Sequence, residues 1–157
     1  MNNFCEYKFN IPEYVRAVLS RLEENGENAY IVGGSLRGML LGRLPHDFDL
    51  ASSAEPIRAC EIFSDMRVIK TGLAHGTVTV LVPHSGRPAD REGGYDLIEC
   101  TTCRTEGGYS DGRHPDAVSF TGRIEDDLSR RDFTVNAMAL TIADEGDENK
   151  PSILDLF

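Results

Sequence analysis

Residues 31–50 of this chain read IVGGSLRGMLLGRLPHDFDL, and this stretch indicates both the fold and the chemistry. A short apolar strand runs into Gly33 and Gly34, where small residues let backbone N–H groups approach phosphate oxygens. A helix that begins at Ser35 adds the positive end of its dipole, and Arg37 supplies a fixed positive charge. We therefore predict a phosphate-binding turn.

The second half of the stretch predicts a metal site. Phe48 and Leu50 alternate with Asp47 and Asp49 over residues 46–51, so burial of the apolar side directs both carboxylates to the other face. Paired carboxylates suit divalent cations. Thirteen aspartates would give roughly one such pair by chance, and a solvated acidic strand face is the alternative. The order of strand, glycine turn, helix and acidic strand favours metal-assisted phosphoryl or nucleotidyl transfer.

Size and composition indicate one ordinary globular domain. The chain has 157 residues, 40% hydrophobic and 27% charged, and single domains usually have about 100–200 residues. No apolar run approaches the roughly 20 residues of a membrane span. The first residues lack the basic and apolar regions of a signal peptide, so we expect a cytoplasmic protein without a membrane partner.

The four cysteines are too few and too unevenly spaced for a disulfide scaffold, and we expect reduced thiols. Cys100 and Cys103 form a C-x-x-C pair, for which zinc or redox chemistry is the alternative. The preceding residues read as a strand, on which positions three apart face opposite sides. That geometry is poor for one metal.

The formal net charge of −10 argues against strong nucleic-acid binding by this chain alone. Positive side chains are concentrated in one later segment, which suits a triphosphate or a single RNA end. Its members are Arg104, Arg113, His114, Arg123, Arg130 and Arg131.

Apolar spacing and turn residues predict a series of short helices and strands. We expect helices from Pro12 to the Asn25-Gly26 stop, over 35–41, from Ser52 or Ser53 to Phe63, and over 125–131. Strands are expected over 29–32, 46–51, 66–70, 76–82, 95–102 and 153–157. Residues 83–94 are expected to be a surface loop, 103–122 a long functional loop, 133–142 an apolar segment and 144–148 a solvated turn.

Five motifs together resemble one known family, the class II tRNA nucleotidyltransferases and bacterial poly(A) polymerases of the DNA polymerase β superfamily. The motifs are IVGGSLRGMLLGR at Ile31–Arg43, HDFDLAS at His46–Ser52, GLAHGTVTV at Gly72–Val80, IECTTCRTEGGYSDGRHPD at Ile98–Asp116 and DLSRRDFTVNAMAL at Asp127–Leu140. The resemblance spans nearly all of residues 28–157. It implies an α+β head domain with a small, mixed, mostly antiparallel sheet flanked by helices.

The resemblance also implies roles for the residues of the first two motifs. Gly33, Gly34, Ser35 and Arg37 would hold the incoming triphosphate. The aspartates Asp47 and Asp49 would bind two Mg²⁺, or Mn²⁺ in their place, and Glu99 would complete a catalytic carboxylate triad. Without the resemblance, Glu99 would equally be an exposed strand glutamate.

The RRDFTVNA segment resembles a nucleotide-sugar motif, in which Asp132 would accept a hydrogen bond from a ribose 2′-hydroxyl. Arg131 or Arg130 would pair with phosphate or fix Asp132, and Asn136 would be a further contact. An ion-pair cluster of Asp126, Asp127, Arg130 and Arg131 is the alternative, equally favoured for Arg130. His75 is expected to be a structural turn residue.

Two departures from the family pattern stand out. Gly38 replaces the acidic residue that usually follows the motif arginine. The chain also ends before the family's neck, body and tail domains, which select the base and hold tRNA. We therefore expect residues 1–157 to be a head domain that is weakly active or inactive in isolation.

The implied function is metal-dependent transfer from CTP or ATP to an RNA 3′ end, with tRNA CCA addition as the first candidate and no DNA partner. Poly(A), CC-only and A-only addition are alternatives within the enzyme class. A non-catalytic nucleotide-binding regulatory domain and a metal-free phosphate-binding module are alternatives from other classes. The sequence leaves the oligomeric state open.

Overall fold

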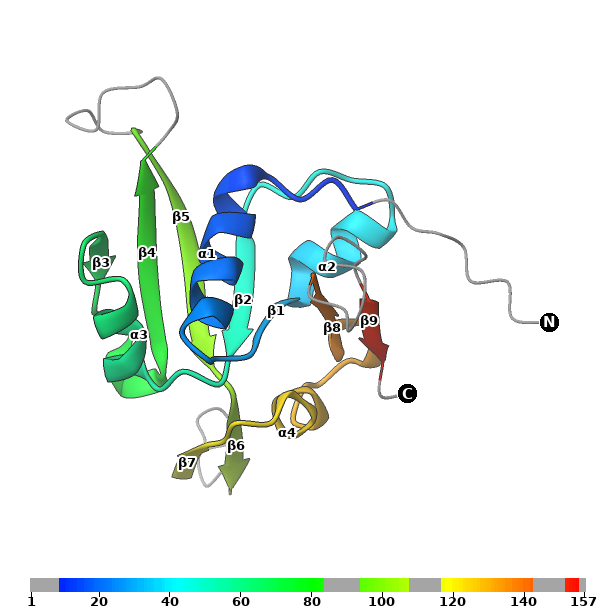
Figure 1. The fold of residues 1–157 in the computed structure, drawn as a ribbon. Coiled ribbons are helices and arrows are strands. Elements are labelled where there is room, and N and C mark those ends of the chain that lie inside the picture. Colours follow the sequence, from blue (N-terminus) through cyan, green and yellow to red (C-terminus); the bar gives the residue numbers. More distant parts are fainter. Residues whose placement is uncertain (1–8, 84–93, 108–116, 143–151, 156–157) are drawn as a thin grey trace.

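The computed structural model describes residues 9–83, 94–107, 117–142 and 152–155. Their helices and strands follow one another along the chain as shown in Figure 1. In order, they are α1 Glu13–Glu24, β1 Ala29–Val32, α2 Gly33–Leu40, β2 Phe48–Ser52, α3 Pro56–Ile62, β3 Arg67–Ile69, the 3₁₀ turn η1 Leu73–His75, β4 Thr77–Pro83, β5 Tyr95–Thr102, β6 Arg104–Gly107, β7 Ala117–Phe120, α4 Ile124–Ser129, the 3₁₀ turn η2 Thr134–Asn136, β8 Met138–Thr141 and β9 Ser152–Asp155.

Seven strands form one mixed sheet in the order β3-β4-β5-β2-β1-β8-β9. The neighbouring strands β2 and β5 are parallel, and the other five pairs are antiparallel. The parallel register places Asp49 opposite Glu99, and β1 on the other side of β2 places Val32 opposite Asp49. The predicted mixed, mostly antiparallel sheet flanked by helices is therefore confirmed.

The two faces of the sheet are covered differently. One face carries the larger core, to which α1 contributes Val15, Val18, Leu19 and Leu22 at helical spacing. Phe48 and Leu50 point into this core. On the opposite face Val32, Ala51 and Ala139 pack with Ile124 and Leu128 of α4 in a smaller cluster. Because strand side chains alternate, Asp49 and Glu99 lie on the side of the smaller cluster.

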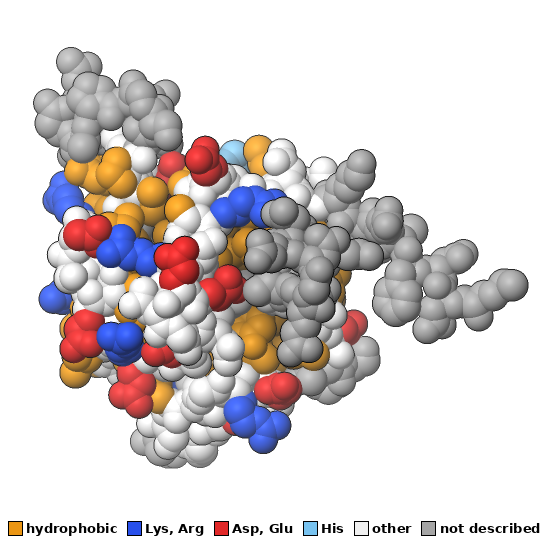
Figure 2. Space-filling view, viewed as in Figure 1, with side chains coloured by type: hydrophobic (Ala, Val, Ile, Leu, Met, Phe, Trp, Pro, Cys, Tyr) orange, Lys and Arg blue, Asp and Glu red, His pale blue; other side chains and the backbone are white. Residues whose placement is uncertain are grey.

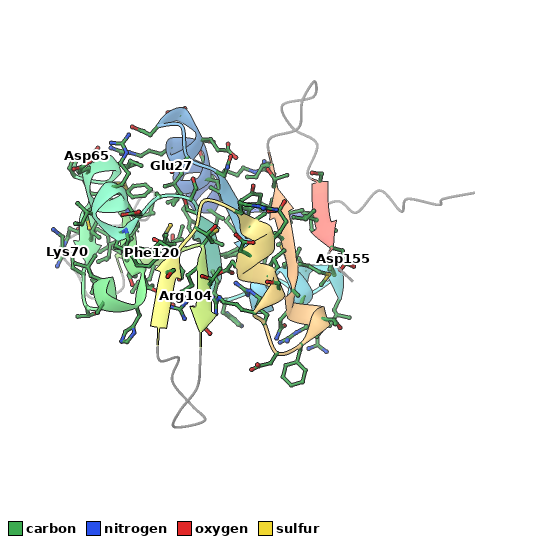
Figure 3. All side chains as sticks on the ribbon, turned by 90° about the horizontal axis from the view of Figure 1, so that it is seen from below. Glu27, Asp65, Lys70, Arg104, Phe120 and Asp155 are labelled. Atoms are coloured by element: carbon green, nitrogen blue, oxygen red, sulfur yellow. The ribbon has the colours of Figure 1, made fainter. Side chains whose placement is uncertain are left out.

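The expected loop over residues 103–122 is wrong, because β6 and β7 form a two-stranded hairpin within it. Its register pairs Arg104 with Phe120 and Glu106 with Val118, and Figure 3 shows Arg104 and Phe120 side by side. β6 alternates charged residues with Thr105 and Gly107 and has no apolar side chain. β7 has only the short apolar alternation of Val118 and Phe120, which is a weak indication of a strand. Residues 108–116 lie outside the described part of the chain.

The first residue of β6 and the last residue of β7 contact η1 and the glycine that follows it. An Arg104 guanidinium nitrogen donates to the backbone oxygen of His75. The Phe120 ring packs over Gly76, so that a Cβ there would lie 2.7 Å from Phe120 Cε1. Gly76 itself has a φ of 82°, which places it in the left-handed region. His75 lies in this turn, as expected, and its contact with the hairpin is made by its backbone oxygen.

Most element boundaries agree with the sequence, and three differ where they concern the site. β1 and β5 have the predicted bounds. The helix expected from Ser35 begins two residues earlier, at Gly33. The acidic strand begins at Phe48, so Asp47 precedes it instead of lying on it. α4 begins at Ile124 and ends at Ser129, before Arg130 and Arg131.

The remaining predicted elements lie mostly within the described residues. Residues 133–142 contain η2 and β8. The final strand begins one residue earlier than predicted and spans Ser152–Asp155, and the predicted positions 156 and 157 lie outside the described residues. Of the loop expected over 83–94, residues 84–93 lie outside the described part of the chain, as does the turn expected over 144–148. None of the helices described has the length and apolar character that a membrane crossing requires.

Candidate functional site

The glycine turn joins β1 directly to α2. Gly33 has a φ of 68°, a conformation that glycine adopts without the steric cost of a side chain. No side chain caps the N-terminus of α2, so its first backbone N–H groups have no side-chain acceptor. These groups and the positive end of the helix dipole favour an anion at this position.

Ser35 contributes to this turn through its backbone and not through its hydroxyl. Its Oγ donates a hydrogen bond of 2.8 Å to the backbone oxygen of Val32, and the residue is buried. The hydroxyl proton is therefore already used within the fold. Ser35 can still offer its backbone N–H to an anion, because it lies in the first turn of α2.

Arg37 is exposed and connects α2 to η2. Its Nη1 donates to Asn136 Oδ1 at 2.7 Å, and its Nη2 lies 3.9 Å from the position of a Cβ on Gly34. The amide of Asn136 thus orients the guanidinium over the turn. Gly38, which follows the arginine in place of the usual acidic residue, has no side chain that could do so. The sequence placed Arg37 and Asn136 in a nucleotide site without predicting this hydrogen bond.

Asp49 and Glu99 project from neighbouring strands and are exposed, as is Asp47 in the bend before β2. Among the described residues, none of the three carboxylates forms a hydrogen bond or an ion pair with the protein. Asp49 Oδ2 lies 3.6 Å from the position of a Cβ on Gly33. The carboxylate therefore faces the glycine turn.

The pKa of Asp49 is raised above its ordinary value. The main cause is partial desolvation by surrounding atoms, with a further contribution from the negative charge of Asp47. Arg131 opposes the shift through its positive charge. Part of the Asp49 side chain contacts solvent, yet its surroundings disfavour the negatively charged carboxylate. A bound cation would compensate this charge.

The donor atoms of this site suit a divalent cation, although the described residues hold no cluster of three or more His, Cys, Asp or Glu side chains arranged for a metal ion. Mg²⁺ prefers carboxylate oxygens and usually binds one or two of them together with substrate phosphates and water. Asp47 and Asp49 have that chemistry and no competing partner in the described part of the protein. Asp47 and Asp49 therefore fit a divalent cation whose other ligands are substrate phosphates and water.

Arg131 lies on the other side of the glycine turn. Its Nη1 is 3.5 Å from the position of a Cβ on Gly33 and 3.4 Å from the backbone oxygen of Asn136. Its Nη2 and Nε donate to Asp127 Oδ2 at 2.9 and 3.3 Å. One end of the guanidinium is thus held by α4, and the other end faces the turn.

Arg130 belongs to the ion-pair cluster that was the alternative to a nucleotide contact. Its Nε and Nη2 donate to Asp127 Oδ1 at 3.1 and 2.8 Å, and its Nη1 donates to Glu106 Oε1 at 2.9 Å. Arg104 donates to the same Glu106 oxygen at 2.8 and 3.0 Å. Asp126 does not join this cluster, because its carboxylate accepts from the Thr121 hydroxyl.

Asp132 is exposed and has no hydrogen bond or ion pair with any described residue. Neither Arg130 nor Arg131 fixes its carboxylate, because both arginines donate to Asp127. The assigned role of Asp132 toward a ribose stays a prediction. Arg113 and His114 lie outside the described residues.

The cysteine pair is divided between the two faces of the sheet. Cys100 is buried in the larger core and Cys103 in the smaller cluster. Burial raises the pKa of each thiol to about 12. The expected free thiols and the opposite directions of the two side chains are confirmed.

Two residues of the site had no assigned role in the sequence prediction. Asp127 appeared only in the alternative of an ion-pair cluster, and its side chain is 1% exposed and contacts both arginines. Glu106 lay in the expected loop, and its side chain is 7% exposed. The spacing of Asp127 to Arg130 and Arg131 is a signal in the sequence, whereas the position of Glu106 depends on the hairpin.

Comparison with known proteins identifies the family of this chain. The family model described as Poly A polymerase head domain matches residues 29–157. The CCA-adding enzyme of Lactobacillus gasseri is 47% identical over 136 residues, which are 85% of this chain and 31% of the relative. That of Pediococcus pentosaceus is 48% identical over 145 residues, 92% of this chain and 32% of the relative. The chain thus spans about a third of the relatives it matches.

Solved structures share the fold. The CCA-adding enzyme of Bacillus stearothermophilus, solved in complex with CTP, has a TM-score of 0.66 and 34% identity, covering 94% of this chain and 31% of that one. A tRNA nucleotidyltransferase complexed with a primer tRNA and an incoming ATP analog has a TM-score of 0.55 and 26% identity, covering 89% and 34%. With its glycine turn, its paired carboxylates and a family match over residues 29–157, this chain belongs to the poly A polymerase head domain family.

Proposed function

We propose that this chain is the head domain of a metal-dependent nucleotidyltransferase that adds nucleotides from CTP or ATP to the 3′ end of tRNA. The relatives named CCA-adding enzymes support the substrate class, as do the solved relatives with CTP or with tRNA and an ATP analog. Mg²⁺ is the proposed cofactor. We place the protein in the cytoplasm, where thiols such as Cys60, Cys100 and Cys103 remain reduced.

The observation that carries the proposal is the position of three groups around Gly33. An uncapped helix N-terminus begins there, Arg131 Nη1 lies 3.5 Å from the position of its Cβ, and Asp49 Oδ2 lies 3.6 Å from it. Positive groups that attract phosphate thus adjoin a carboxylate that attracts a cation. Phosphoryl transfer depends mainly on such positioning and charge stabilisation.

The positive groups and the carboxylates of the site would bind different parts of the substrate complex. Backbone N–H groups at the start of α2, together with Arg37 and Arg131, would hold the triphosphate. Asp47 and Asp49 would hold Mg²⁺, with Glu99 directed toward the attacking 3′-hydroxyl. A bound cation lowers the pKa of such a hydroxyl and neutralises charge on the leaving pyrophosphate. Asp132 would accept a hydrogen bond from the ribose.

The stabilisation of the protein by bound ligands tests these assignments. CTP with Mg²⁺ should raise the melting temperature, since a ligand at about 100 times its Kd adds about 2.7 kcal/mol. Cytidine should have little effect, and Asp49→Ala should remove the part of the shift that needs Mg²⁺. dCTP should bind roughly ten- to a hundredfold more weakly if Asp132 contacts the 2′-hydroxyl.

Nucleotide transfer is tested separately with labelled CTP and tRNA that lacks its 3′ end, with Asp49→Ala as the blank. We expect a low yield of extended tRNA that exceeds this blank. Equal stabilisation by CTP and cytidine, or a CTP shift that does not respond to Mg²⁺, would contradict the proposed site.

A further inference from the structure

Arg131 lies between two carboxylates and pairs with one of them. Asp127 Oδ2 accepts from its Nη2 and Nε at 2.9 and 3.3 Å. The remaining nitrogen, Nη1, and Asp49 Oδ2 lie 3.5 and 3.6 Å from the same point, the position of a Cβ on Gly33. Even so, no ion pair joins Arg131 to Asp49. In the described part of the chain the one other acceptor of Arg131 is the backbone oxygen of Asn136, 3.4 Å from Nη1, and Asp49 has no partner.

Asp127 is itself held in place, so it can fix the guanidinium. It is 1% exposed and lies in α4, four residues before Arg131. Its other oxygen, Oδ1, accepts from Arg130 at 2.8 and 3.1 Å and from the backbone N–H of Arg104 at 3.3 Å. Glu106 holds the far side of Arg130 at 2.9 Å. The Asp127 carboxylate therefore has contacts on both oxygens that prevent it from following Arg131.

An arginine without such a partner would turn toward other negative charge. The guanidinium is always charged and sits on a flexible stem, so it takes the carboxylate that is within reach. Asp49 is beside the same glycine and has no partner in the described part of the chain. An Arg131–Asp49 pair would occupy the carboxylate oxygens that a cation needs.

We propose that Asp127 is a positioning residue that holds Arg131 over the glycine turn and thereby keeps it from pairing with Asp49. Asp49 then stays free for a divalent cation while Arg131 stays free to meet phosphate. The cation part of this inference rests on the proposed function. The placement of Arg131 does not rest on it.

Titration of the purified chain with Mn²⁺ alone tests the cation part. Asp127→Asn should weaken Mn²⁺ binding by roughly three- to tenfold, the range expected when a partly exposed ion pair competes for the ligand. Removing the arginine as well, in Asp127→Asn with Arg131→Met, should restore the affinity to that of Arg131→Met. A purely structural role of Asp127 would not give this recovery, because the second substitution repairs no packing.

Asp126→Asn is the matched control. It removes the neighbouring carboxylate of α4, which accepts from Thr121 and touches neither arginine, so Mn²⁺ affinity should not change. Unchanged affinity in Asp127→Asn, or a double variant as weak as Asp127→Asn, would overturn the cation part. All affinities are compared at a temperature at which circular dichroism shows each variant folded.

A metal-free measurement decides the placement of Arg131 even if Asp127→Asn does not fold or the unchanged chain does not bind Mn²⁺. Arg131→Met, Asp49→Asn and their combination are compared by urea unfolding in the natural background. With Arg131 held by Asp127, the effects of the two substitutions on the unfolding constant should multiply to within about twofold. A larger coupling would show that Arg131 already pairs with Asp49, and would overturn the proposal. Absence of Mn²⁺ binding to the unchanged chain would instead count against the proposed cation site.

Discussion

At the scale of single residues, Gly33 leaves the space between Arg131 and Asp49 without a side chain. Its φ of 68° turns the chain from β1 into α2, and Arg131 and Asp49 flank the place where a side chain would stand. A methyl group there would make ordinary contacts at 3.5 and 3.6 Å. The cost of a side chain at Gly33 is therefore mainly a backbone cost.

Gly33→Ala should lower the free energy of unfolding by about 1–2 kcal/mol, the cost of left-handed backbone for an L-residue. Gly34→Ala is the matched control, since Gly34 has no positive φ and its Cβ would meet only Arg37 at 3.9 Å. It should be neutral or stabilising by up to about 1 kcal/mol, because alanine favours helix. Urea unfolding measures both, and equal losses would contradict a conformational role for Gly33.

Asp49 should lower the stability of the metal-free protein at neutral pH. Because its pKa is raised in the folded state, the folded chain binds this proton more tightly than the unfolded chain, and stability falls as the pH rises through that window. Asp49→Asn should therefore be more stable than the unchanged chain at pH 7, with the gap narrowing toward pH 4.

Asp65 provides the contrast for this pH test. Hydrogen bonds from the Arg21 side chain lower its pKa, so its ionised form stabilises the folded state above the ordinary pKa and the effect is lost in acid. Asp65→Asn should be neutral or destabilising at pH 7. Stabilisation by both substitutions would point to general charge repulsion instead of a local effect at Asp49.

At the scale of elements, the hairpin of β6 and β7 connects η1 to α4. Phe120 packs over Gly76, while Glu106 contacts Arg130 just after α4. Gly76→Ala should cost about 1–3 kcal/mol, from left-handed backbone and from a contact of 2.7 Å with the ring edge. In a Phe120→Ala background only the backbone cost of about 1 kcal/mol should remain. Additive losses in urea unfolding would show that the ring does not press on Gly76.

The elements that the sequence predicted well are those whose own residues carry the pattern. β1 and β5 alternate or concentrate β-branched and aromatic residues, and α1 has an apolar stripe at helical spacing. β6 has neither, because Arg104 and Glu106 face partners on η1 and near α4, and β7 offers only Val118 and Phe120. The stability of the hairpin comes from contacts distant in sequence, which local patterns do not contain.

The residues of the site likewise differ in how far local sequence predicts them. The glycine turn and Asp49 were found because they lie within one short motif, and their neighbourhood depends on adjacent strands. The hydrogen bond from Arg37 to Asn136 joins residues 99 positions apart. The burial of Asp127 likewise depends on how α4 packs, so its spacing to the arginines indicated an ion-pair cluster but not that the cluster is buried.

At the scale of the whole molecule, negative charge exceeds positive charge and the two are interspersed. The net charge is −10, and Figure 2 shows acidic and basic side chains mixed over one face without a continuous basic patch. Repulsion among excess like charges opposes the compact state. The buried cluster around Asp127 and Glu106 is screened less by salt than exposed pairs are.

Stability should therefore rise with ionic strength, because the Debye length falls from about 30 Å at 0.01 M to about 8 Å at 0.15 M. Lys70→Glu changes an exposed residue after β3, labelled in Figure 3. It lowers the net charge by two units and should steepen this dependence. Thermal unfolding at several NaCl concentrations measures both chains, and a fall in melting temperature with salt would show that surface ion pairs outweigh the net repulsion.

The strand order has a consequence for the time at which the protein takes shape during its synthesis. β1 lies between β2 and β8, and the ribosome makes β8 long after β1 at about 5–20 residues per second. Until Met138–Thr141 emerges, one edge of the apolar β1 has no hydrogen-bonding neighbour. The nascent chain thus passes through an interval in which this largely buried strand is open to pairing with another chain, and this interval ends only when β8 is added.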